Sequence, residues 1–216
     1  MSPIHGLFAA AFWLLPVSSL LAETLKVQIT PDIPSVTVKH NGKNVTIQRN
    51  QDKDNRIVDA YAKTSRPCPP FCIQPAQLAP GVETIGELEL LDYLKRVSAG
   101  DDSILVIDSR TPDWVKRGTI PGSVNIPWTR LNVSQSDPFT VIDILESRFD
   151  VQVLEGLYDF SGAKTLVLFC NGMWCGQSPS NIRALLKIGY PADRIKWYRG
   201  GMQDWSALGL TVVTPD

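Results

Sequence analysis

The stretch TLVLFCNGMWCGQS, residues 165–178, decides the fold that we expect for this chain. It begins with an apolar run that has no polar residue after Thr165, which is typical of a strand covered on both faces. Cys170 follows the run directly, and a loop with two glycines leads toward a helix expected at residues 181–188. Because ligands bind beyond the carboxyl ends of parallel strands, the stretch predicts a functional site at Cys170.

Strands and helices alternate on either side of this stretch. Leucines at three-residue spacing predict an amphipathic helix over residues 85–97, with Thr84 as its N-cap. Short apolar runs predict buried strands at residues 104–107 and 195–198. The alternation predicts an α/β domain over residues 84–216, with a mainly parallel sheet and helices on both faces.

The residues before this domain follow a different pattern. Period-two alternation on both sides of Asn41-Gly42 predicts a β hairpin, since both positions of a type I′ turn need a positive φ. We expect this hairpin within a small β extension over residues 23–62, with a third strand at residues 26–29. Five prolines between residues 66 and 80 predict an irregular linker over residues 63–83.

The N-terminus has the layout of a targeting signal. Residues 7–22 are almost entirely apolar and end in small residues, which predicts a signal peptide over residues 1–22 and a protein that is exported to the periplasm or secreted. The run is short for a membrane span and contains Pro16, so we expect no span after cleavage. An uncleaved anchor and a buried helix are the alternatives.

Composition narrows the classes of function. The chain is 44% hydrophobic and 20% charged, which is typical of a soluble globular protein. Its net charge is −1 and it has no long basic run, so we expect no nucleic-acid partner. Nothing in the sequence implies an organic cofactor.

The four cysteines form two local pairs, Cys68 with Cys72 and Cys170 with Cys175. In an exported protein these are two disulfides, one disulfide plus reactive thiols, or four ligands of one metal. The stiff Cys-Pro-Pro-Phe-Cys loop favours a disulfide between Cys68 and Cys72, with a redox-active pair that passes on sulfur or electrons as the alternative. The spacings differ from the usual zinc-knuckle spacing and the two histidines are not placed to help, so we expect no metal.

Cys170 occupies the position of a nucleophile. A thiol between a strand and a helix meets loop N–H groups and the positive end of the helix dipole, both of which lower its pKa. Gly172 and Gly176 allow the loop to curl around the sulfur. The alternative is an inert buried cysteine at the end of a core strand. The remaining members of the expected active-site loop are Asn171, Met173, Trp174, Gln177 and Ser178.

Three separated blocks carry a resemblance to a known family. Asp108-Ser109-Arg110, Trp114 and residues 118–126 (GTIPGSVNI) precede the strand that ends in Cys170, and residues 198–205 (YRGGMQDW) follow it. In this order the blocks resemble the signatures of the rhodanese family. The resemblance implies a sulfurtransferase in which Cys170 carries sulfur as a persulfide, with a small sulfur donor and a thiol acceptor as partners.

Residues in these blocks also have physical roles that can be inferred directly, and some of them depart from the family pattern. Asp108 and Arg110 are expected to pair and to fix the strand end beside the site. Thr119 stands where the family usually has histidine, and the loop is longer than usual and lacks Lys and Arg, which predicts weak activity with thiosulfate. Phosphatases of this architecture need Cys-x5-Arg, but Gly176 and Asn181 occupy that position after the two cysteines, which argues against phosphoryl transfer.

Two further hypotheses come from other classes of function. Cys175 either resolves a persulfide or sulfenate on Cys170 or is a packed or partly exposed bystander. The first role makes a thiol-disulfide redox relay the second hypothesis. The third is a non-catalytic binding module that docks a protein partner through the N-terminal hairpin.

Overall fold

A parallel sheet forms the centre of the structure, a computed structural model that describes residues 25–132 and 134–215. The predicted signal peptide lies outside the described residues. The sheet has strand order β3-β9-β8-β4-β5, and each neighbouring pair is parallel. Its strands are β3 (Glu83–Ile85), β4 (Ile104–Asp108), β5 (Val124–Asn125), β8 (Thr165–Phe169) and β9 (Ile195–Tyr198). The predicted strands at 104–107, 165–169 and 195–198 are therefore confirmed.

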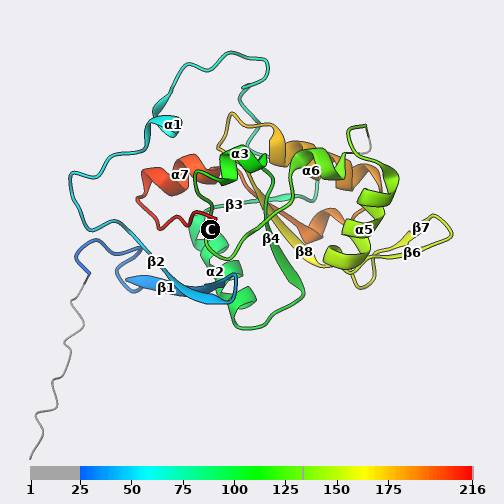
Figure 1. Ribbon diagram of the computed structural model, residues 1–216, viewed down its shortest axis with the longest axis horizontal. Coiled ribbons are helices and arrows are strands. Elements are labelled where there is room, and N and C mark those ends of the chain that lie inside the picture. Colours follow the sequence, from blue (N-terminus) through cyan, green and yellow to red (C-terminus); the bar gives the residue numbers. More distant parts are fainter. Residues whose placement is uncertain (1–24, 133, 216) are drawn as a thin grey trace, which may run out of the picture.

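Helices cover both faces of this sheet (Figure 1). Along the central strand β8, Val167 and Phe169 face a cluster that includes the buried leucines of α2, whereas Leu166 and Leu168 face a second cluster. The first face holds α2 (Glu87–Ser98) and α7 (Gly201–Ala207), and the second holds α4 (Trp128–Leu131), α5 (Pro138–Phe149) and α6 (Gln177–Lys187). The α/β class expected from the sequence is confirmed.

The start of α2 differs from the prediction. Thr84 does not cap the helix, because it belongs to β3 and pairs with Trp197 of β9. Its hydroxyl donates instead to the Ala76 carbonyl at 2.6 Å. The helix begins after Gly86, whose N–H donates to the Glu89 carboxylate at 3.0 Å. Parallel pairing thus keeps residues 83–85 extended, which a helical periodicity alone does not reveal.

The predicted hairpin is present as β1 (Ser35–His40) and β2 (Lys43–Gln48), and its turn has positive φ at both Asn41 and Gly42. Its buried side chains, Val36, Val38 and Ile47, join the cluster that includes α2. The third strand expected at residues 26–29 is absent. The N–H groups of Lys26 and Val27 donate to the Gln51 side chain at 3.0 and 3.1 Å, not to a neighbouring strand.

Residues 63–82 contain no helix or strand, as the prolines predict. The structure joins Cys68 and Cys72 by a disulfide. The segment also binds the loop after β8, since the Gln74 N–H donates to the Met173 carbonyl at 2.8 Å. Arg199 fixes it from β9's end by donating to the Gln74 carbonyl at 2.8 Å. This segment is therefore anchored on the sheet's carboxyl edge.

Short elements complete the described part of the chain. The hairpin of β6 and β7 projects from the domain in Figure 1. No helix among the described residues has the length and apolar character needed to cross a membrane. The remaining elements are α1 (Asp59–Ala62), α3 (Pro112–Val115), β6 (Gln152–Leu154), β7 (Leu157–Asp159) and a 3-10 turn, η1 (Ala192–Arg194).

Candidate active site at the carboxyl edge of the sheet

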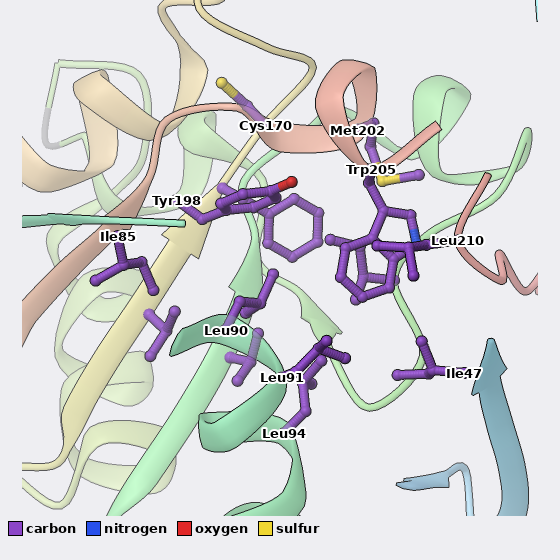
Figure 2. Close-up of a cluster of buried hydrophobic side chains, with 14 of the residues drawn as sticks. Ile47, Ile85, Leu90, Leu91, Leu94, Cys170, Tyr198, Met202, Trp205 and Leu210 are labelled. Atoms are coloured by element: carbon purple, nitrogen blue, oxygen red, sulfur yellow. The ribbon is translucent and has the colours of Figure 1, made fainter. Parts of the chain in front are cut away.

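Cys170 lies at the end of the central strand and points out of the core. Its side chain is buried, but Figure 2 shows the sulfur directed away from Tyr198, Met202 and Trp205 of the apolar cluster. The chain turns after Cys170 and enters α6 at Gln177, earlier than the expected start at residue 181. The thiol is thus placed between a strand end and a helix start.

Hydrogen bonds prepare the Cys170 sulfur for ionisation. The Ser178 hydroxyl donates to Sγ at 3.1 Å, and the protonated thiol donates to the Cys175 carbonyl at 3.4 Å. Burial alone would raise the pKa of Cys170, but hydrogen bonds from the Cys175 thiol, from Ser178 and from the Gly172 N–H lower it to about 7. A large fraction of Cys170 is therefore thiolate at neutral pH.

Cys175 has the opposite character. It is buried, and burial together with the neighbouring Cys170 sulfur holds the pKa of its thiol well above the usual value. It therefore stays protonated while Cys170 ionises, and it donates to the Cys170 sulfur. The two free cysteines form one acid and base pair, not two equivalent thiols.

A close backbone approach shapes the loop. Gly201 has φ of 56°, and a Cβ there would lie 2.3 Å from the Cys170 carbonyl oxygen. This glycine lets the Met202 N–H donate to that carbonyl at 3.0 Å. Gly176, which we expected to supply conformational freedom, has an ordinary φ of −88°. Space does not require glycine at position 176 either, since the nearest atom to an added Cβ would lie 4.0 Å away.

A buried polar network supports the neighbouring strand end. The structure pairs Asp108 with Arg110, both fully buried, and Arg110 Nε lies 2.9 Å from the carboxylate. Arg110 also donates to the Tyr61 hydroxyl at 3.0 Å, and Thr119 donates to Asp108 at 2.7 Å. Burial alone would lower the pKa of Arg110, but hydrogen bonding and the charge of Asp108 raise it, so the guanidinium stays charged. The Tyr61 hydroxyl donates onward to Asn171 at 3.5 Å, which connects the network to the loop.

The family of this chain follows from a comparison with family models. The model of the rhodanese-like domain matches residues 90–208, which is more than half of the chain. The chain belongs to the rhodanese-like domain family. A helix-turn-helix transcriptional regulator of Mycobacterium tuberculosis is 25% identical over 121 residues, which are 56% of this chain and 42% of the regulator. The chain thus spans less than half the length of that relative.

Solved structures with a similar arrangement have low sequence identity. The BH2092 protein of Bacillus halodurans is 19% identical, with a TM-score of 0.43 over 61% of this chain and 77% of its own. A thiosulfate sulfurtransferase of Pseudomonas aeruginosa is 17% identical, with a TM-score of 0.41 over 62% and 21%. A human single-domain sulfurtransferase is 22% identical, with a TM-score of 0.36 over 57% and 95%.

A cavity of about 450 Å³ opens beside the loop of this rhodanese-like domain. Cys175 lines the cavity. Cys170 does not line it, but its thiol donates to the Cys175 carbonyl at 3.4 Å. None of the described residues that line it carries a charge. Four of its ten lining residues are aromatic and come from separate segments, namely Phe71, Trp114, Trp128 and Trp174.

The neighbours Met173 and Trp174 differ in burial, since Trp174 is buried and Met173 is exposed. The Trp174 indole donates to the Gln203 side chain at 2.8 Å and is covered by the Arg66 guanidinium, 3.8 Å from the ring centre. Phe71 contacts the same ring edge-on, with the centroids 5.6 Å apart. Trp174 therefore packs under the 63–83 segment and forms the cavity wall.

Sequence reasoning missed several residues that hold this site. Trp197 donates to the Ser178 hydroxyl at 3.1 Å, which leaves the hydroxyl proton free to point at Cys170. Gln203 lies within the C-terminal block, residues 198–205, but no pattern there marks it as a partner of Trp174. Tyr61 stands in a polar stretch without any pattern, so no sequence signal marks its contact with Arg110.

Metal binding has no support in the described part of the chain, where no group of three His, Cys, Asp or Glu side chains could hold an ion. Cys68 and Cys72 are bonded to each other, and Phe71, which stands between them in the sequence, contacts Trp174.

Proposed function

We propose that this rhodanese-like domain is a sulfurtransferase that carries sulfane sulfur as a persulfide on Cys170. The observation that carries the proposal is the Cys170 thiol itself, which ends the central strand and has a pKa lowered to about 7 by hydrogen bonds. An inert core cysteine would have its pKa raised by burial. Membership of the family adds support.

The reaction has two displacement steps at sulfur. The Cys170 thiolate attacks the sulfane sulfur of a donor R–S–SH, the donor S–S bond breaks, and R–S⁻ leaves and takes up a proton. The product is Cys170–S–SH. An acceptor thiolate then attacks the outer sulfur, which returns Cys170 as thiolate and forms the acceptor persulfide. No oxidant or cofactor enters either step.

Within this scheme the surrounding groups have distinct roles. Ser178 and the N–H groups of the loop stabilise the Cys170 sulfur in its anionic forms, before attack and again when it leaves. The Cys175 thiol, whose pKa is raised, acts as a further hydrogen-bond donor to that anion. Asp108 and Arg110 position the neighbouring strand end and contact no reacting atom in this proposal.

Single cysteine variants test the proposal by turnover. With methanethiosulfonate as donor and a small thiol as acceptor, we expect Cys170→Ser to lose sulfur transfer and Cys175→Ser to keep it with a modest fall in rate. Equal activity of wild type and Cys170→Ser would contradict the proposal. Circular dichroism of both variants controls for folding.

A thiol-disulfide relay is the second candidate, because the Cys170 and Cys175 thiols form a hydrogen-bonded pair. It requires both cysteines in every turnover. Loss of activity in Cys175→Ser as complete as in Cys170→Ser, together with an isolable Cys170–Cys175 disulfide, would favour the relay over sulfur transfer.

Export of the protein completes the proposal. It is supported by the apolar run at residues 7–22 and is compatible with the bond between Cys68 and Cys72, since disulfides persist outside the cytosol. Mass spectrometry of the protein from its native compartment tests it. An N-terminus close to residue 23 is the expected result, and a mature chain that retains residues 1–22 is the contrary one.

A further inference from the structure

The uncharged aromatic cavity beside Cys175 is unusual for a site that would use thiosulfate. Thiosulfate is a small dianion without an apolar part, and a buried dianion needs cationic partners. The cavity offers it aromatic faces, side-chain amides, the Ser180 hydroxyl and the Cys175 thiol, but no cationic group. Its volume of about 450 Å³ lies in the range of small-molecule sites and is far larger than such an anion requires.

The cationic side chains that contact the aromatic wall or the polar network beside Cys170 have partners of their own. Arg117 stacks on Trp114, with its guanidinium 4.8 Å from the ring centre, and does not line the cavity. The Arg110 guanidinium is fully buried and bonded to Asp108, Tyr61 and the Gly118 carbonyl. Arg66 stacks on Trp174 and lines a separate cavity on the other side of the 63–83 segment. Neither lines the cavity beside Cys175.

We propose that this cavity is a binding site for sulfur donors with an uncharged, apolar organic body, such as organic persulfides and thiosulfonates, which the domain prefers over thiosulfate. The inference rests on the proposed function of Cys170. The aromatic walls contact the organic body, and the sulfane sulfur lies at the Cys175 end, where it is nearest to Cys170.

Two polar atoms of lining residues have no hydrogen-bond partner. The indole N–H of Trp128 and the side-chain oxygen of Gln177 are both buried without a partner in the described part of the chain. Buried polar atoms without partners are rare. A ligand in the cavity reaches either atom only after the Trp128 or Gln177 side chain shifts, because both atoms have almost no accessible surface.

The chemistry with a thiosulfonate balances without another reagent. The Cys170 thiolate attacks the sulfane sulfur of R–SO2–S⁻, the S–S bond breaks, and the sulfinate R–SO2⁻ leaves with the bonding pair. Cys170–S–S⁻ is the product. Methanethiosulfonate and benzenethiosulfonate both carry a single negative charge, so the pair isolates the effect of the apolar body from that of charge.

The test compares kcat/KM for thiosulfate, methanethiosulfonate and benzenethiosulfonate. Because a phenyl group is buried, we expect kcat/KM for benzenethiosulfonate to exceed that for methanethiosulfonate by about 10- to 100-fold. This ratio is corrected for the ratio of the rates at which the two donors react with a free small thiol in solution. Trp128→Ala and Phe71→Ala should each reduce that preference to within about threefold. Phe139→Ala, an exposed aromatic on α5, is the matched control and should retain it. Equal preference in wild type and both cavity variants would overturn the inference.

A charge placed in the cavity gives the converse test. Ser180 lines the cavity on α6, so Ser180→Lys adds the cation that the wall lacks. We expect kcat/KM for thiosulfate to rise about tenfold in this variant while that for benzenethiosulfonate does not rise, since only the dianion gains a strong ion pair. An unchanged thiosulfate preference would count against the inference.

Binding without chemistry separates the inference from the proposed function. In Cys170→Ser, benzenethiosulfonate should quench tryptophan fluorescence with saturation, and methanethiosulfonate should not at equal concentration. If no donor loads Cys170 in the wild type yet this binding occurs, the sulfurtransferase proposal fails and the apolar site stands. If loading occurs without any preference or saturable binding, the apolar site fails and the sulfurtransferase proposal stands.

Discussion

The two cysteine pairs of this chain have nearly the same spacing and very different surroundings. Cys68 and Cys72 lie on a proline-rich segment at the surface and are joined by a disulfide. Cys170 and Cys175 are free thiols, both buried, between the central strand and a helix. Spacing along the chain therefore says little about the chemistry of a cysteine pair, whereas burial and hydrogen-bond donors decide it.

The two pairs also meet in space through aromatic contacts. Phe71, which stands between Cys68 and Cys72, contacts Trp174, which stands beside Cys175. The exposed pair flanks Phe71, which forms part of the cavity wall, and the buried pair contains the sulfur that we propose to react. We therefore expect stability effects from the first pair and activity effects from the second.

The largest difference should appear in turnover. Cys170→Ser should reduce sulfur transfer from methanethiosulfonate by on the order of 10³-fold or more, because the nucleophile is lost. The double variant Cys68→Ser/Cys72→Ser should remain within about threefold of wild type with this small donor, which makes little use of the aromatic wall. Comparable losses of sulfur transfer in both variants would show that the two cysteine pairs act together, and would contradict a separation of stability and activity between them.

Stability should depend most on the polar network beside the buried pair. Arg110→Ala leaves the Asp108 carboxylate buried without its partner and should lower the free energy of unfolding by about 3–5 kcal/mol. Urea denaturation at pH 7 measures the change. The exposed ion pair of Lys116 with Asp113 provides the control, since Lys116→Ala should give no measurable effect. A small effect of Arg110→Ala would mean that the network does not support the strand end.

Loss of the surface disulfide should have a smaller effect. The bond closes a loop of only five residues, so Cys68→Ser/Cys72→Ser should lower the free energy of unfolding by about 2 kcal/mol. Adding a reductant should lower the stability of the wild type by a similar amount and leave that of the double variant unchanged. A reductant effect of equal size in both proteins would place its origin elsewhere.

The smallest effect concerns the ionisation of Cys170. Ser178→Ala removes the hydroxyl that donates to Sγ at 3.1 Å and should raise the pKa of Cys170 by about one unit. The thiolate is the reactive form, so the alkylation rate falls as the pH drops through the pKa. At pH 7 the variant should react about fivefold more slowly, and the two rates should converge above pH 9. Ser147→Ala, at an exposed serine of α5 that does not line the cavity, should leave the profile unchanged.

Much of the fold could be predicted from the sequence, because it rests on local patterns. The uninterrupted apolar run before Cys170 and the Asn41-Gly42 turn each have a short-range physical cause. Thr84 was misassigned because a residue that pairs with the remote strand β9 looks like a helix cap when only its neighbours are considered. The expected third strand at residues 26–29 is absent for a similar reason. The Lys26 N–H donates to the side chain of Gln51, which lies 25 positions away in the sequence.

The candidate site was predictable only in its centre. The position of Cys170 and the pairing of Asp108 with Arg110 follow from nearby residues. The cavity does not, because its wall unites aromatic residues from segments as distant as Phe71 and Trp128. The segment that looked like a linker is a wall of the site, which only its docking on the 170–178 loop reveals.

The most direct test of sulfur carriage on Cys170 is the mass of the cysteine peptides after exposure to a sulfur donor. Purified wild type, Cys170→Ser and Cys175→Ser are treated with methanethiosulfonate, alkylated and mapped, before and after addition of a thiol. Persulfide formation on Cys170 predicts one additional sulfur on that residue in the wild type and in Cys175→Ser. The thiol should remove this sulfur, and Cys170→Ser should gain none. A protein that gains no sulfur on Cys170, and is recovered instead with Cys170 bonded to Cys175, would contradict sulfur carriage on Cys170.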